Sequence, residues 1–311
     1  MRAMILGAGL GTRLRPLSRL RPKPALPVRG LPLIEYNLEL LASLGVREVL
    51  INLHHLGAEL RAAAEAVRPP GMALRFSPEP RPLGTGGGIR RAARFLAGSD
   101  PSLVLAGDMI LDLPLGEILE LHHRRRDAVT LVLRDDPRAD RFGTIGLDGD
   151  GRVRRIAGRF DVGGGCESGV YVNATVISRR ALETLPAREC FSHLDGWLMP
   201  LLRLGAEDIR GIVLPRGSGT WVPVGTPTEY LEANFTPLSL SYLNAECRAR
   251  ARGAELTPER VVGPGAVVEP RAELERVVVW DGERVPTGTR ARQGVFAGGR
   301  FVRCADGAGD G

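Results

Sequence analysis

Alternating glycines near the start of the chain have the spacing of a phosphate-binding loop. Gly7, Gly9 and Gly11 follow a short apolar run, and Thr12 and Arg13 come directly after them. Because glycine has no side chain, the backbone N–H groups of such a loop can converge on anionic oxygens. The hydroxyl and the guanidinium would add further donors. A tight turn without a ligand is the alternative for the same glycines.

Two common nucleotide-binding motifs do not fit this loop. Counted from Gly7, the dinucleotide-binding pattern G-x-G-x-x-G needs its third glycine at position 12, which is Thr12. A Walker P-loop needs the pattern G-x-x-x-x-G-K-[ST], which occurs nowhere in the chain. The loop is therefore expected to be a phosphate site of another class.

A lone lysine is the second candidate for phosphate chemistry. Lysine and arginine total 42, and Lys23 is the single lysine, which leaves 42 − 1 = 41 arginines. Codon bias could have spared one lysine by chance. The physical alternative is that a compact ammonium fits between phosphate oxygens where a planar guanidinium would not. Pro22 and Pro24 flank Lys23, and we expect them to hold it extended and so to preorganise its charge.

A carboxylate after an apolar run is the third candidate for a ligand-binding residue. Asp108 follows residues 103–106, which we predict to form a buried strand. Carboxyl groups at the C-terminal ends of parallel strands face the ligand crevice, so we expect Asp108 to face a ligand there. A turn-forming role after Gly107 is the alternative for this residue, and Asp112 is an alternative carboxylate.

The elements that would position these residues alternate between strands and helices over residues 1 to about 135. Expected strands lie at residues 3–6, 48–53, 73–76, 103–106 and 129–133. Expected helices lie at residues 34–44, 57–67, 87–96 and 115–126. This order predicts an α/β fold with a Rossmann-like, mixed and mostly parallel sheet covered by helices. A hairpin turn at residues 148–151, a strand at 169–172 and helices at 182–185, 197–204 and 228–234 complete the first domain, residues 1–240.

The apolar pattern of the chain changes after residue 260. Apolar residues recur there at a step of six, with one step of five in the middle: Val262, Val268, Leu274, Val279, Val285 and Ala291. Such hexapeptide repeats are typical of a parallel β-helix, in which the apolar residue of each short strand points inward. We expect a second domain, residues 241–311, with about two β-helix coils and a disordered tail, Ala305 to Gly311. Acyl transfer by this segment is disfavoured because none of the five histidines lies in it.

Composition argues against several classes of protein. The formal net charge is +6, but the basic clusters are short and aromatic residues, at 5%, do not interleave with them, so we expect no nucleic-acid partner. Apolar runs stay far below the roughly 20 residues of a membrane span, and the N-terminus lacks a signal-peptide pattern. We therefore expect a cytoplasmic protein without a membrane partner. Four scattered cysteines without a Cys-x-x-Cys pair are expected to be reduced.

The opening sequence resembles that of the sugar-nucleotide pyrophosphorylases, which are nucleotidyltransferases that make nucleotide sugars. The segments GAGLGTRLRPLS and RPKPALPVRGLPLIEYNLELLASLGV carry the resemblance, and further matching motifs begin at Leu83, Gly107, Phe142, Ser168 and Trp221. The resemblance covers about residues 1–240 and looks closest to the mannose-1-phosphate guanylyltransferase and muramate-phosphate uridylyltransferase branches. The hexapeptide repeats resemble the left-handed β-helix that many members carry at the C-terminus, through which a homo-oligomer could form.

This resemblance implies a reaction and a set of site residues. A sugar 1-phosphate would attack the α-phosphorus of a nucleoside triphosphate, with GTP or UTP preferred, and pyrophosphate would leave, with Mg2+ as cofactor. The catalytic residues would be Arg13, Lys23 and Asp108, with Asp108 as the metal ligand. The nucleotide would be bound by Gly7, Gly9, Gly11, Thr12, Leu83, Gly84, Thr85 and Gly86, and the sugar by Gly143 and Gly169.

Two departures from the family pattern leave a second function open. The family's second acidic metal ligand, expected two residues after Trp221, is replaced by Pro223. The Glu-Lys-Pro motif on the sugar side is also missing, unless Arg159 substitutes for its lysine. Magnesium can be held by one carboxylate, water and substrate phosphates, so catalysis remains the favoured prediction. The alternative is a catalytically degenerate subunit that binds a nucleotide sugar and regulates a partner.

Overall fold

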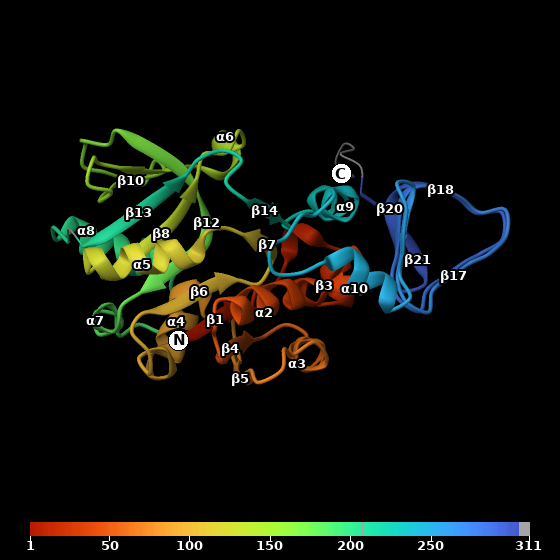
Figure 1. Ribbon diagram of the computed structural model, residues 1–311, viewed down its shortest axis with the longest axis horizontal. Coiled ribbons are helices and arrows are strands. Elements are labelled where there is room, and N and C mark those ends of the chain that lie inside the picture. The colour runs from red at the N-terminus through yellow and green to blue at the C-terminus, as the bar shows by residue number, and fades with distance from the viewer. Residues whose placement is uncertain (207, 305–311) are drawn as a thin grey trace.

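A ten-stranded mixed sheet forms the centre of the computed structural model, which describes residues 1–206 and 208–304 (Figure 1). Its path runs through β11 (Phe160–Asp161), β10 (Val153–Ile156), β9 (Ile145–Leu147), β12 (Glu167–Ile177), β6 (Ser102–Ala106), β1 (Arg2–Leu6), β4 (Glu48–Leu53) and β5 (Ala73–Pro78). Off this path, β8 (Val129–Arg134) pairs with β12 and with β13 (Ile209–Leu214). The strands β6, β1, β4 and β5 are parallel, whereas β12 runs antiparallel to both β6 and β8.

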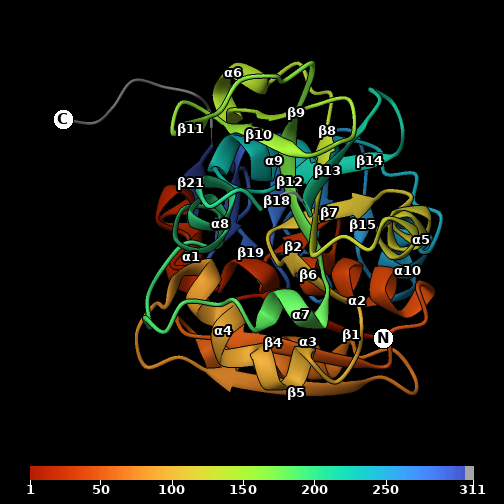
Figure 2. The same cartoon turned by 90° about the vertical axis from the view of Figure 1, so that its left-hand side faces the viewer.

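Helices cover both faces of the parallel part of the sheet. Successive side chains of a strand point to opposite faces, so each strand contributes to an apolar cluster on either face. Ala3 and Ile5 of β1 share a buried cluster with residues of α2 (Leu33–Ser43), α3 (Gly57–Ala66) and α5 (Leu115–Arg125). Met4 belongs to a second cluster with residues of α4 (Gly84–Leu96). Burial on both faces explains why residues 3–6 of β1 form an unbroken apolar run. Figure 2 shows β9, β10 and β11 at one end of the molecule and β4 and β5 at the other.

Shorter elements surround this sheet and supply segments near the candidate site. The helices among them are α1 (Leu17–Leu20), α6 (Ala139–Phe142), α7 (Arg179–Leu182), α8 (Met199–Arg203) and α9 (Pro227–Phe235). Single helical turns lie at η1 (Thr12–Leu14), η2 (Lys23–Ala25) and η3 (Leu194–Leu198), and β2 (Pro27–Val28) pairs with β3 (Leu31–Pro32). β7 (Met109–Asp112) and β14 (Thr220–Pro223) form a separate antiparallel pair, in which Pro223 lies opposite Met109.

The C-terminal strands pair in parallel at a fixed offset. After α10 (Ala245–Ala251) and β15 (Glu255–Leu256), three strands pair in parallel: β16 (Arg260–Val262), β18 (Glu273–Val279) and β20 (Arg290–Ala297). β21 (Arg300–Arg303) then pairs antiparallel with β20. β17 (Val267–Val268) and β19 (Arg284–Val285) form another parallel pair. Val262 lies opposite Val279, Val268 opposite Val285, and Leu274 opposite Ala291, an offset of 279 − 262 = 17 residues each time. These six residues pack in one apolar cluster.

The C-terminal strands also share a buried core with the first part of the chain. Leu17 and Tyr230 belong to the same cluster as Val261, Trp280 and Val295. In Figure 1 these strands, in blue, lie beside α9 and next to the N-terminal segment, in red. The two parts of the chain are therefore joined by apolar packing.

Most of the predicted elements are confirmed, with bounds that shift by at most three residues, except that β12 extends five residues beyond the strand predicted at residues 169–172. The mixed, mostly parallel α/β sheet is confirmed, and so is the turn at residues 148–151, where Gly151 N–H donates to Asp148 O at 2.9 Å. The helix predicted at residues 182–185 is wrong, because α7 ends at Leu182. The extended conformation predicted for Lys23 is also wrong, because Lys23 begins the helical turn η2. The predicted disordered tail lies outside the described residues. None of the described helices is long and apolar enough to span a membrane.

Candidate active site

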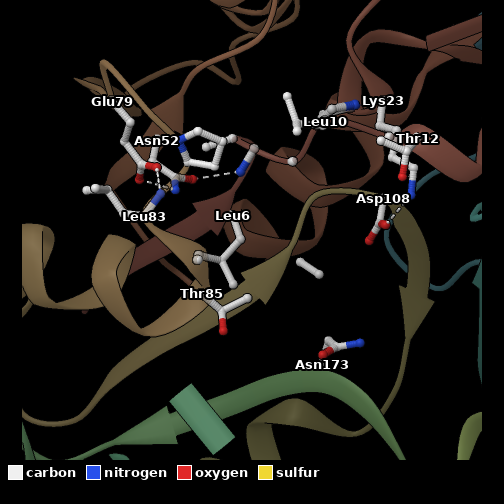
Figure 3. Close-up of a pocket in the computed structure, with 18 residues that line it drawn as sticks. Leu6, Leu10, Thr12, Lys23, Asn52, Glu79, Leu83, Thr85, Asp108 and Asn173 are labelled. Carbon is white, nitrogen blue, oxygen red and sulfur yellow. Dashed lines mark hydrogen bonds and ion pairs between the residues drawn. The ribbon is translucent and has the colours of Figure 1, made fainter. Parts of the chain in front are cut away.

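Most of the predicted nucleotide-binding residues line one cavity of about 460 Å³ (Figure 3). Its lining residues include Gly7, Gly9, Gly11, Thr12, Lys23, Leu83, Gly84, Thr85 and Asp108. The cavity lies beyond the C-terminal ends of β1 and β6 and beside the first turn of α4. In an open α/β sheet this is the crevice in which ligands bind.

The glycine loop and Lys23 pack directly against each other. Gly11 has a φ of 61°, the left-handed conformation that glycine adopts readily. A Cβ atom at this position would lie 2.9 Å from Ser18 Cβ and 3.1 Å from Lys23 Cγ. Ser18 also donates a hydrogen bond from its hydroxyl to Gly11 O at 2.7 Å. Both the backbone conformation and the close packing therefore require glycine here.

Lys23 forms an ion pair with Asp108 at the wall of the cavity. Its Nζ lies 2.9 Å from Asp108 Oδ2. The Lys23 side chain is 11% exposed and the Asp108 side chain 35%, so the carboxylate is the more open partner. Gly107 N–H donates to Leu6 O at 3.0 Å, which keeps the Asp108 segment beside the end of β1. Among the described residues nothing donates a hydrogen bond to Asp108 Oδ1, which leaves this oxygen available to a ligand.

Two buried polar residues, Asn52 and Glu79, connect the glycine loop to the loop at Leu83 (Figure 3). Asn52 Oδ1 accepts a hydrogen bond from Gly7 N–H at 2.7 Å, and its Nδ2 donates to Glu79 Oε1 at 2.7 Å. Glu79 Oε2 accepts from Leu83 N–H at 3.2 Å. Because a buried polar group is costly unless it is hydrogen-bonded, these bonds fix the two loops relative to each other.

Behind the cavity, His193 connects Thr85 to β12. The Thr85 hydroxyl accepts from His193 N–H at 3.0 Å and lies 2.7 Å from His193 Nδ1. His193 Nε2 lies 3.1 Å from the Tyr171 hydroxyl, which also hydrogen-bonds Thr175. Burial lowers the pKa of His193 to about 4, so its ring is neutral near pH 7. A neutral imidazole has one donor and one acceptor nitrogen, which suits two hydroxyl partners.

Arg13 lies outside the residues that line this cavity, although Thr12 lines it. A Cβ atom at Gly225 would lie 3.6 Å from Arg13 Nη2, so the guanidinium is placed beside the segment before α9. Gly225 N–H donates to Glu229 Oε2 at 2.7 Å. Arg141 Nη2 lies 2.9 Å from the other oxygen, Glu229 Oε1, an ion-pair distance without the angle of a hydrogen bond. Two arginines therefore lie close to Gly225.

Three predicted glycines also lie outside the cavity lining, and backbone packing accounts for each. Gly86 N–H donates to Phe191 O at 2.9 Å, and a Cβ there would clash with the Phe191 ring. Gly143 ends α6 with a φ of 73°. Gly169 packs so closely on β8 that a Cβ would lie 3.0 Å from Leu133 Cβ. Their roles in binding nucleotide and sugar remain predictions.

Sequence reasoning misses three polar residues of the cavity: Asn52, Glu79 and Asn173. Asn52 and Glu79 lie at the ends of β4 and β5, and a polar residue ending an apolar strand is a signal that could have found them. Asn173 has a φ of 53° and lies where the pairing of β12 with β8 shifts register. Such a bulge re-aims a side chain without leaving a pattern in the sequence. The Asn173 side chain lies on the β12 side of the cavity (Figure 3).

The position of the missing second acid does lie beside Asp108. Pro223 is opposite Met109, and Val224 N–H donates to Asp108 O at 3.0 Å. Pro223 has no side-chain atom that could bind a metal. Within residues 1–206 and 208–304 there is no group of three or more His, Cys, Asp or Glu side chains that could hold one. Among the described residues that line the cavity, Glu79 and Asp108 are the carboxylates, and Asp108 is the one that lies beside Pro223.

The two substitutes considered from the sequence are placed elsewhere. Asp112 lies at the far end of β7, where its oxygens accept hydrogen bonds from Ser241 N–H and the Ser241 hydroxyl. Arg159 pairs with Asp195 at 2.6 Å. Neither Asp112 nor Arg159 is among the described residues that line the cavity.

The mixed sheet and the cavity at its carboxyl edge, with a glycine loop, a lysine and a carboxylate, define an α/β enzyme that acts on phosphate groups. The sequence profile of the Nucleotidyl transferase family matches residues 2–238, and the chain belongs to that family. Mannose-1-phosphate guanylyltransferase of Mycobacterium tuberculosis is 30% identical over 306 residues, which cover 92% of this chain and 81% of that protein. Mannose-1-phosphate guanylyltransferase 1 of Arabidopsis thaliana is 27% identical and covers 92% of this chain and 82% of its own length.

Solved structures share the fold. HddC from Yersinia pseudotuberculosis is 24% identical and covers 75% of this chain and 97% of its own, with a TM-score of 0.61. The same protein has been solved in complex with GMP-PN, and that structure has a TM-score of 0.60 to this chain. At this identity the likeness supports the architecture of the nucleotidyltransferase fold.

Proposed function

We propose that this enzyme joins a sugar 1-phosphate to a nucleoside triphosphate, giving a nucleotide sugar and pyrophosphate, in the manner of a mannose-1-phosphate guanylyltransferase. The observation that carries the proposal is the contact of Lys23 with Gly11 in the wall of the same cavity that Asp108 lines. The relatives from M. tuberculosis and A. thaliana support GTP and mannose 1-phosphate as the substrates. The complex of HddC with GMP-PN supports a guanine nucleotide in this cavity.

The reaction mainly needs positioning and charge neutralisation. An oxygen of the sugar phosphate attacks the α-phosphorus in line, and pyrophosphate leaves on the opposite side, so no side-chain nucleophile is required. Backbone N–H groups at Gly9 and Gly11, together with Thr12, would hold the triphosphate and the departing pyrophosphate. The Lys23 ammonium would offset negative charge as it develops on the leaving group. Arg13 would act from beside Gly225, outside the residues that line the cavity.

The cavity offers a chemical reason to prefer guanine to uracil. Glu79 lines it and, as a carboxylate, can only accept hydrogen bonds. Each carboxylate oxygen has two lone pairs, so the bonds from Asn52 and Leu83 leave acceptor capacity. Guanine carries an exocyclic amino donor that uracil lacks. Leu83, Gly84 and Thr85 would complete the base site.

Magnesium fits this site as an ion shared with the substrate. Asp108 would hold it through Oδ1, which has no donor among the described residues, and substrate phosphates would supply further oxygens. The ion would offset charge on the phosphate oxygens when bound. The sugar would bind on the β12 side, near Asn173, with Gly143 and Gly169 behind it.

We also propose that the C-terminal strands form a short β-helix within a second domain, residues 241–311. The offset of 279 − 262 = 17 residues between paired strands supports this, because two steps of six and one of five make one coil of 17. The inward packing of Val279 and Val285 supports it too. A homo-oligomer formed through this segment remains a prediction.

A second candidate function is a regulatory subunit that binds a nucleotide sugar without turnover. The observation in its favour is Pro223, which stands beside Asp108 where the family has a carboxylate. A panel of GTP, UTP, ATP and dTTP crossed with mannose and glucose 1-phosphates, with magnesium, separates the two. We expect pyrophosphate release, fastest with GTP and mannose 1-phosphate. Binding of a nucleotide sugar with no pyrophosphate release from any pair would support the regulatory subunit instead.

A further inference from the structure

The C-terminal strands contact the segment that carries Lys23. Arg21 lies two residues before Lys23 and pairs with Asp281, which follows β18. Its Nη1 and Nη2 donate to the two Asp281 oxygens at 2.5 and 2.8 Å, a two-point contact. Beside it, a Cβ at Gly298 would lie 3.0 Å from Leu20 Cδ1, so backbone after β20 also packs on α1.

A buried tryptophan holds this ion pair in place. The Arg21 guanidinium carbon lies 4.8 Å from the ring centroid of Trp280, a cation–π contact. Trp280 is 2% exposed, and its Nε1–H donates to the Tyr230 hydroxyl at 2.9 Å. Tyr230 in turn donates to Pro27 O at 2.6 Å. Trp280 is therefore fixed on both its indole nitrogen and its ring face.

The contact at Arg21 is mechanically coupled to Lys23. Pro22 stands between the two residues, and its fixed φ limits how far one can move without the other. Ser18 belongs to helix α1, which ends just before Arg21, and its hydroxyl donates a hydrogen bond to Gly11 O. The side-chain stem of Lys23 packs against the same glycine. A displacement of Arg21 would therefore move the lysine within the cavity.

We propose that Arg21, Asp281 and Trp280 form a clamp that positions Lys23, so that the C-terminal strands set the rate of nucleotidyl transfer. The proposal rests on the proposed function, in which Lys23 neutralises phosphate charge. Arg21, Trp280 and Asp281 are positioning residues, since none of them is among the described residues lining the cavity. A shift of about 1 Å in a catalytic group can cost roughly a hundredfold in rate.

The test compares Arg21→Ala and Asp281→Asn in the full-length chain with the unchanged protein. We expect kcat for pyrophosphate release to fall at least about tenfold, KM for either substrate to change less than about threefold, and Arg21→Lys to be intermediate. The matched control is Glu246→Gln. It removes an ion pair between Glu246 Oε2 of α10 and Arg29 Nη2, which lie 3.5 Å apart, and this pair does not contact Lys23. We expect this variant to leave kcat within about twofold. A lowered melting temperature with unchanged kcat would show a merely structural contact and would overturn the proposal.

A double-mutant cycle with Lys23→Ala separates the clamp from the proposed function. If Arg21 acts through Lys23, then Arg21→Ala should cost little further activity once Lys23 is alanine. An equal fold-loss in both backgrounds would overturn the clamp while leaving the role of Lys23 intact. Full activity of Lys23→Ala by itself would overturn the role of Lys23, and the clamp with it.

Discussion

Lys23 packs its side-chain stem against Gly11, so the cation and the glycine loop form one structural unit. A Cβ atom at Gly11 would lie 3.1 Å from Lys23 Cγ and 3.4 Å from Lys23 Cδ. The ammonium at the end of this stem reaches Asp108 at 2.9 Å. The loop therefore sets the position of the Lys23 ammonium, and a substitution at either Gly11 or Lys23 should displace the other residue.

Replacing Lys23 should abolish most of the activity whichever residue is introduced. Lys23→Ala removes the charge, and Lys23→Arg forces a larger planar group into the space under Gly11. We expect both to lower kcat by about 10²–10³, the usual cost of losing one electrostatic contact to a transition state. For Lys23→Ala the loss of the ion pair should cost about 1 kcal/mol or less of folding stability, because Asp108 is open enough to be solvated.

The matched control is the reverse exchange at an exposed site of the preceding helix α1, Arg19→Lys. Initial rates of pyrophosphate release and thermal melts check all three variants. Near-normal turnover of Lys23→Arg would show that the single lysine has no special function, and that codon bias explains it.

Two glycines of the loop should respond differently to alanine. Gly11→Ala places a side chain at positive φ and 2.9 Å from Ser18 Cβ, so we expect it to lower the free energy of unfolding by about 1–2 kcal/mol or more. A Cβ at Gly9 would meet nothing within 4 Å, so Gly9→Ala should leave stability unchanged. If Gly9 faces phosphate, its variant should still raise KM for the triphosphate.

Urea unfolding and steady-state kinetics of the two variants measure these effects. Equal stability of the Gly11 and Gly9 variants would contradict the packing of Lys23 against the loop. An unchanged KM in a stable Gly9→Ala protein would contradict phosphate binding at Gly9.

The sequence predicts this site best where the chemistry is local. The glycine loop and the lysine between two prolines can be predicted because neighbouring residues define them. The strand before Asp108 predicts that this carboxylate faces the ligand crevice. The position of Asn173 in the cavity cannot be predicted from the sequence, because its orientation depends on how β12 and β8 pair across the sheet. The pair between Arg21 and Asp281 spans 260 residues, so no local pattern announces it.

The wrong helix at residues 182–185 has a similar cause. Leu182 and Leu185 are spaced like one face of a helix, and both do pack into the same apolar cluster. The chain nevertheless leaves the helix after Leu182, and Leu185 reaches the cluster from a turn. Apolar spacing thus predicts burial here but not the conformation that achieves it.

His193 should make the protein less stable in acid. Burial lowers its pKa from 6.5 to about 4, so between these values the unfolded chain binds a proton that the folded protein does not. The free energy of unfolding then falls as the pH drops through this window, by at most about 1.4 kcal/mol per pH unit from this group. His193→Gln lacks this titration, so the unchanged protein's advantage over it should shrink by roughly 2 kcal/mol between about pH 7 and pH 4.5.

Urea unfolding of the two proteins at several pH values gives this difference directly, and acid-sensitive carboxylates cancel because both proteins contain them. A difference that stays constant with pH would mean that His193 titrates normally in the folded protein. The hydrogen bonds that its neutral ring makes to Thr85 and Tyr171 would then have to be assigned differently.

Restoring an acid at Pro223 should strengthen magnesium binding. The residue lies beside Asp108 across the β7–β14 pair, so Pro223→Asp would place a second carboxylate near the proposed magnesium ligand. We expect the magnesium concentration for half-maximal pyrophosphate release to fall about tenfold, which corresponds to about 1.4 kcal/mol. Pro223→Asn is the matched control, because it also removes the proline ring but adds no charge.

The same pair of variants bears on which function is right. If the enzyme already works with one carboxylate, Pro223→Asp should change the magnesium requirement more than kcat at saturating metal, since substrate phosphates complete the coordination in both proteins. If Pro223→Asp instead created turnover in a protein that had none, the chain would be the regulatory subunit whose catalysis was lost with that acid. Identical magnesium titrations of Pro223→Asp and Pro223→Asn would show that the metal does not bind between these two strands.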